Sequence, residues 1–79
     1  MNDMQARALA ADVLAAIAPE ADLATVRDDE DLRAALDLDS MDFMNFVVAL
    51  SERTGSAIAA ADAPRLYTLR GLLAYLSTR

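Results

Sequence analysis

The chain has 79 residues, enough for one small domain over residues 1–79, and it contains no Cys, His or Lys. Disulfides, zinc fingers, Ser-His-Asp triads, Schiff bases and P-loops are therefore excluded, and we expect neither a metal site nor an enzyme. Thirteen acidic residues against seven arginines give a net charge of −6, and residues 1–51 hold eleven of the acids but only three arginines. Such a surface repels nucleic acid and anionic lipid and attracts basic protein surfaces.

No membrane span is expected, because no apolar run approaches roughly 18 residues. The N-terminus also lacks the basic segment that begins a signal peptide. We therefore expect a soluble protein of the cytoplasm. We also expect it to be a monomer.

Apolar residues at helical spacing predict a first helix over about residues 4–17, with Asp3 as its N-cap. Pro19 ends this helix, because proline has no N–H and its ring blocks the preceding turn.

The connection over residues 18–39 is long for a compact domain. Leu23 and Val26 are expected to anchor it to the core. Residues 31–36 are expected to form one helical turn with its two leucines directed inward.

A second long helix is predicted over residues 40–54, with Asp39 or Ser40 as its cap and Gly55 just after its end. Asp42 lies in its first turn, where the helix dipole favours a carboxylate.

A short helical turn is expected over residues 61–66. A last helix follows Thr68, which is a good N-cap, and its expected buried stripe consists of Leu69, Leu72, Leu73 and Leu76. Gly71 should weaken that helix by about 1 kcal/mol relative to Ala. No apolar alternation of period two occurs, so no strands are expected. The predicted fold is all-α, a small four-helix bundle with a long loop between its first and second helices.

The helix over residues 40–54 has two apolar faces when it is projected at about 100° per residue. The natural core face consists of Phe43, Phe46, Val47 and Leu50. The opposite face consists of Met41, Met44 and Val48, flanked by Asn45 and Glu52. Either the helix is central and buries both faces, or the second face is exposed and binds partner proteins. We favour the partner surface, since a chain of 79 residues can hardly surround a helix.

Residues 36–42 read Leu-Asp-Leu-Asp-Ser-Met-Asp, where the acidic connection meets this helix. The segment resembles the signature Leu-Gly-x-Asp-Ser-Leu of the acyl carrier protein family, with Met41 in place of the last leucine. Residues 62–69 and 74–76 also resemble the third and fourth helices of bacterial carriers. The resemblance covers about residues 5–77.

This resemblance implies a discrete carrier of bacterial type with the acyl-carrier-protein fold. Ser40 is then the attachment site of a covalent 4′-phosphopantetheine arm, derived from coenzyme A, which holds an acyl group as a thioester. A phosphopantetheinyl transferase adds the arm, and Asp39 helps to present Ser40 to it. The other implied partners are acyl-transferring or ketosynthase-type enzymes of fatty-acid, polyketide-like or specialised lipid biosynthesis, with basic docking surfaces. From the acidic cluster and the second apolar face of the helix, we predict that these enzymes dock on Asp37, Met41, Asp42, Met44, Asn45, Val48 and Glu52.

The sequence departs from the family pattern at several positions. Asp37 replaces the usual glycine, and Asn45 and Ser51 stand where fatty-acid carriers often have acids. Phe43, which we expect to face inward, stands where a small residue often lies near the acyl pocket. These departures favour a dedicated carrier over a general fatty-acid carrier.

Two alternatives stay open. Aminoacyl or peptidyl carriers usually read Leu-Gly-Gly-x-Ser-Leu, whereas Asp37 and Asp39 favour the acyl type. The other alternative is an interaction module of the same fold that is never modified, against which the intact Ser40 argues.

Overall fold

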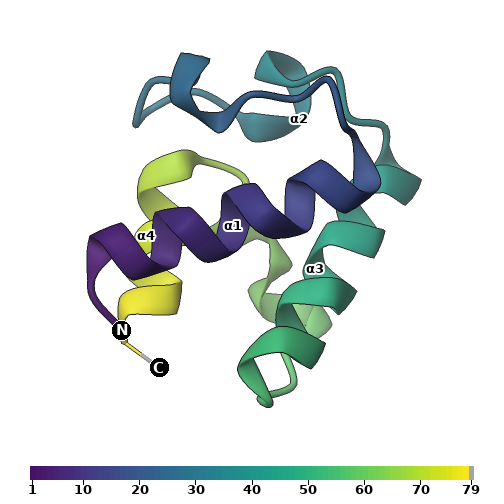
Figure 1. Cartoon of the computed structure of the whole chain (residues 1–79). Helices are drawn as coiled ribbons and strands as arrows, with labels where there is room; N and C mark the ends of the chain where they lie inside the picture. The colour runs from purple at the N-terminus through teal and green to yellow at the C-terminus, as the bar shows by residue number, and fades with distance from the viewer. Residues whose placement is uncertain (79) are drawn as a thin grey trace.

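The computed structural model describes residues 1–78, and within that range it contains helices and no strand. In chain order the elements are α1 (Asp3–Ile17), the 3₁₀ helix η1 (Leu23–Thr25), α2 (Leu32–Ala35), α3 (Ser40–Thr54), the 3₁₀ helix η2 (Ala60–Leu66) and α4 (Leu69–Ser77). The predicted all-α fold is confirmed as a small bundle of α1, α3, η2 and α4, with the long connection between α1 and α3. Figure 1 shows α1 crossing the molecule, with the connection on one side of it.

The first helix begins earlier than the sequence predicted. Its N-cap is Asn2, so the prediction of Asp3 was wrong. The Asn2 side chain accepts a bond from the Gln5 N–H at 2.8 Å, and the Gln5 side chain accepts one from the Asn2 N–H at 3.0 Å. This capping box satisfies two backbone donors at once, and it leaves Asp3 in the first turn, where its charge suits the helix dipole.

The core lies where α1 packs against both α3 and α4, and α4 packs against η2. The predicted stripes of α3 and α4 are buried, and Tyr75 adds to the stripe of α4. The start of α1 and the end of α4 are also joined, because the Ser77 hydroxyl donates to the Asp3 carboxylate at 3.0 Å. None of the helices in residues 1–78 is both long and apolar enough to cross a membrane.

The connection between α1 and α3 is held to the bundle by side chains and by backbone. Leu23 and Val26 are buried as predicted, while Leu36 is only partly buried at the margin of the core. The Leu32 N–H donates to the Tyr67 carbonyl at 2.7 Å, and the Arg70 N–H donates to the Asp28 carbonyl at 2.9 Å. These two bonds fix the connection against the junction of η2 and α4, just before the segment that enters α3.

Gly71 lies in the first turn of α4, where the backbone of η2 approaches closely. A Cβ atom at this position would lie 2.1 Å from the Arg65 carbonyl oxygen. Tertiary packing therefore requires glycine here, although glycine costs a helix about 1 kcal/mol relative to alanine.

Candidate functional site

The start of α3 is capped by carboxylates. The Asp39 side chain accepts a bond from the Asp42 N–H at 2.7 Å, and the Asp42 side chain accepts a longer one from the Asp39 N–H at 3.4 Å. Of the two caps that the sequence allowed, the structure therefore selects Asp39. Ser40 becomes the first residue of the helix and has no capping role.

Ser40 differs from the other three serines of the chain in its exposure. It is exposed, whereas Ser51, Ser56 and Ser77 are partly buried. Ser51 and Ser77 also donate hydrogen bonds, to the Val47 carbonyl and to a carboxylate. Within residues 1–78 no hydrogen bond engages the Ser40 hydroxyl, so this oxygen is open to a modifying group.

The residue three positions before Ser40 has an uncommon backbone conformation. Asp37 has φ +54°, in the left-handed region, where it replaces the glycine expected from the family pattern. Aspartate tolerates this region better than most side chains, because its short polar group can bond locally. Asp37 therefore adopts a backbone conformation that favours glycine, and it places an acid on the surface of the turn before α3.

A hollow of about 400 Å³ lies against Ser40. Its lining consists of Asp31, Arg33, Ala34, Leu38 and Ser40. Its charged wall is formed by residues of α2 and its N-cap, and its apolar lining includes the buried Leu38. The hollow and the serine thus form one continuous surface.

Arg33 is held in place in the wall of this hollow from two sides. Its Nη2 and Nε donate to the Asp31 carboxylate at 2.8 and 3.2 Å. Its guanidinium carbon lies 3.6 Å from the centre of the Tyr67 ring, a cation–π contact. The hydrogen bond from Arg33 lowers the pKa of the Asp31 carboxyl, and the same bond raises the pKa of Arg33. Sequence reasoning missed this pair, although Arg33 is the one base between Asp28 and Asp42.

The second apolar face of α3 is exposed. Met41, Met44 and Val48, which we call the methionine patch, are 68%, 44% and 51% exposed. The alternative in which α3 buries both faces is therefore wrong. Of the polar residues predicted beside this patch, Asn45 is exposed on the middle of the helix.

Glu52, the other flanking residue, is exposed but distant from Ser40. Twelve residues of helix separate the two, which corresponds to about 18 Å. Glu52 lies instead beside a hollow between α1 and α3 that Asp12 and Arg53 also line. The structure thus groups Asp37, Asp39, Asp42 and Met41 around Ser40, and it leaves Glu52 outside this group.

The inward face of α3 carries an aromatic cluster. Phe43 is buried, as predicted, and its ring centre lies 5.2 Å from that of Tyr67 in an edge-on contact. The Phe46 ring centre is 6.2 Å from that of Phe43. These rings fill the space between α3 and the end of η2 with side chains.

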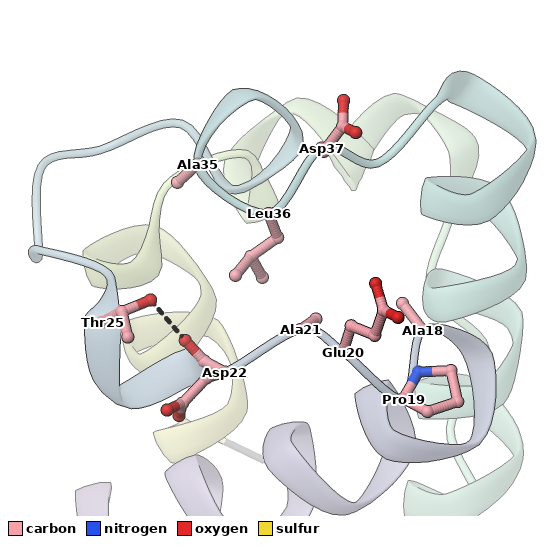
Figure 2. Close-up of a pocket in the computed structure, with 9 residues that line it drawn as sticks. All are labelled: Ala18, Pro19, Glu20, Ala21, Asp22, Thr25, Ala35, Leu36 and Asp37. Atoms are coloured by element: carbon pink, nitrogen blue, oxygen red, sulfur yellow. Dashed lines mark hydrogen bonds between the residues drawn. The ribbon is translucent and has the colours of Figure 1, made fainter.

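A larger hollow, of about 610 Å³, lies between the end of α1, η1 and α2. Figure 2 shows Leu36 pointing into it, while the Asp37 carboxylate points away. Three acidic residues, Glu20, Asp22 and Asp37, are among those that line the hollow. No group of three or more such side chains in residues 1–78 is placed to hold a metal ion.

Comparison with known proteins gives a match that spans most of the bundle and includes Ser40. A family model described as a phosphopantetheine attachment site matches residues 6–76. The matched range includes all of α3 and most of α1 and α4. Among curated proteins, no relative matches the chain.

Proposed function

Because the chain belongs to the family of proteins with a phosphopantetheine attachment site, we propose that it is an acyl carrier protein with Ser40 as its attachment residue. Members of this family carry a covalent 4′-phosphopantetheine group, and they interact with a phosphopantetheinyl transferase and with partner enzymes. The observation that carries the choice of Ser40 is its exposed hydroxyl at the start of α3, where Asp39 does the capping.

The residues around Ser40 fit such a group. The arm supplies a thiol, which this cysteine-free chain does not itself possess. A phosphodiester on Ser40 would lie at the N-terminal end of a 15-residue helix, where the helix dipole favours negative charge. The adjoining hollow leaves space beside the hydroxyl for the first part of the arm.

The acidic surroundings of Ser40 favour an acyl carrier over an aminoacyl or peptidyl carrier. Asp37 and Asp39 precede the serine, where aminoacyl and peptidyl carriers usually have neutral residues. Seven acids and one base lie between Asp28 and Asp42. We infer that the partner enzymes, of fatty-acid, polyketide-like or specialised lipid biosynthesis, dock here with a basic rim.

The methionine patch would supply the apolar centre of that docking surface. It lies on the exposed face of α3 that begins next to Ser40. Methionine side chains adapt to different partners, which suits a carrier that visits several enzymes in turn. In this proposal the chain delivers cargo and catalyses no reaction itself.

The test is the intact mass of the protein after incubation with coenzyme A and a broad-specificity phosphopantetheinyl transferase. We expect the wild type to gain the mass of one arm and Ser40→Ala to gain none. Ser56→Ala is the matched control, because it removes a partly buried serine hydroxyl away from α3, and it should be modified like the wild type. Modification of Ser40→Ala would overturn the assignment.

A further inference from the structure

Arg33 is in an electrostatically unusual place. It is the one base in a stretch of residues 28–42 that holds seven acids. Its guanidinium forms part of the wall of the hollow that Ser40 also lines. An anionic group attached to Ser40 would be repelled by Asp37, Asp39 and Asp42, and a nearby cation would offset part of this repulsion.

The contacts of Arg33 orient its guanidinium and still leave donors for another anion. The two bonds to Asp31 use Nε and one N–H of Nη2. A guanidinium has five N–H donors in a planar fork, so the N–H groups of Nη1 and the second one of Nη2 remain for a second acceptor. Stacking on Tyr67 fixes the plane of the fork, so little side-chain entropy is lost when it binds.

We propose that Arg33 binds the phosphodiester of the arm on Ser40 and directs the arm into the hollow between α2 and α3. This inference rests on the proposed function, since it requires Ser40 to carry the arm. Asp31 and Tyr67 are positioning residues that hold the guanidinium at the wall of the hollow. The apolar lining residues of the hollow, Ala34 and Leu38, would then be available to the part of the arm that follows the phosphate.

The test compares the apo and holo forms of the wild type, Arg33→Gln and Arg65→Gln. Arg65 is a matched control, because it pairs with Asp62 at 3.8 Å and lies over the Tyr75 ring at 5.1 Å, but it does not line the hollow. Two quantities are measured in each form: the melting temperature at low and high salt, and the NMR resonance of the Arg33 Nε–H group.

We expect attachment of the arm to shift the Arg33 Nε–H resonance and the amides of Ala34 and Leu38 in the wild type. Arg33→Gln should lower the melting temperature of the holo form more than that of the apo form, and high salt should remove most of this difference. Arg65→Gln should lower the melting temperatures of the apo and holo forms equally. Arg33→Lys keeps the charge but not the planar fork of donors. Its holo form should therefore lose more melting temperature than its apo form, but by a smaller margin than in Arg33→Gln.

The proposal is overturned if attachment leaves the Arg33 resonance unchanged and shifts only residues 39–42. The same holds if Arg33→Gln lowers the melting temperatures of the apo and holo forms equally, because loss of the Tyr67 contact alone would explain that result. If Arg33→Gln does not fold, the wild-type resonance decides by itself. The intact mass of each sample separates failure of the Arg33 inference from failure of the proposed function, because in the second case Ser40 would carry no arm at all.

Discussion

Two adjacent residues at the start of α3 have separate roles. Asp39 satisfies the helix N-terminus, and Ser40 keeps an exposed hydroxyl. We therefore expect Ser40→Ala to change the free energy of unfolding by less than about 0.5 kcal/mol, as a surface substitution does. Asp39→Ala should cost about 0.5–2 kcal/mol, the usual loss of an N-cap. Urea denaturation of the two apo variants measures both values, and equal losses would contradict the assigned roles.

Asp31 makes the stability of the protein sensitive to acid. Arg33 lowers the pKa of this carboxyl below its ordinary value of 3.8 in the folded state. The stabilisation is therefore complete above about pH 4 and is lost as the pH falls through the lower folded pKa. We expect the melting temperature to decrease when the pH drops below about 4. The decrease should be smaller in Arg33→Gln, where Asp31 has lost its partner. Parallel curves for the two proteins would show that the pair does not couple stability to pH.

At the scale of single elements, the close contact between η2 and the first turn of α4 determines which residue fits at position 71. Gly71→Ala would raise the intrinsic helix propensity of α4, but its Cβ would lie 2.1 Å from the Arg65 carbonyl oxygen. We expect a net loss of about 1–3 kcal/mol in unfolding free energy, as in overpacked sites. The exposed Ala74→Gly in the same helix is the control, with a loss of about 1 kcal/mol from propensity alone. A more stable Gly71→Ala protein would mean that η2 moves away without cost.

The two kinds of side chain at the start of α3 should affect partner binding in different ways. Asp37→Asn removes a charge while keeping a residue type that tolerates positive φ, so it should slow association with the transferase at low salt only. Met44→Ala should accelerate dissociation at both low and high salt, because apolar contacts persist in salt. Surface plasmon resonance measures both rates. If Met44→Ala left every rate unchanged and strongly lowered the melting temperature, the methionine patch would be structural.

Local sequence signals predicted most of the elements. The helix over residues 40–54, its Gly55 end, the Thr68 cap and the buried stripes of α3 and α4 are all confirmed, because each follows from residues close in the chain. Contacts between distant residues were not predictable in the same way. The stacking of Arg33 on Tyr67 and the need for Gly71 arise from packing of η2 against its neighbours. The Asn2 cap, in contrast, could have been predicted from the sequence, because Asn2 and Gln5 have the spacing of a capping box.

At the scale of the whole molecule, the aromatic interior limits where the acyl group of the proposed carrier could lie. Phe43, Phe46 and Tyr67 occupy the space between α3 and the end of η2. An acyl chain buried in the bundle would add about 0.8 kcal/mol for each CH₂ group, so stability would rise with chain length. We expect the melting temperature of the acylated wild type to change little with chain length.

Phe43→Leu is the variant that tests whether the aromatic cluster excludes an acyl chain from the bundle. It opens space beside Tyr67 at less cost than Phe43→Ala, for which a loss of about 3–5 kcal/mol is usual. In this variant the melting temperature should rise with acyl length, if the cargo can then enter the bundle. A steady rise in the wild type itself would contradict the view that the aromatic cluster keeps long chains out.

The measurement that tests the central claim most directly is fragmentation mass spectrometry of the modified wild-type protein. It locates the arm on one residue and therefore distinguishes Ser40 from the serines at positions 51, 56 and 77. The account predicts the added mass on fragments that contain Ser40, with none on the other serines, because only Ser40 among the four is exposed at a helix start. An arm located on any other residue, or no arm after exhaustive incubation with transferase and coenzyme A, would contradict it.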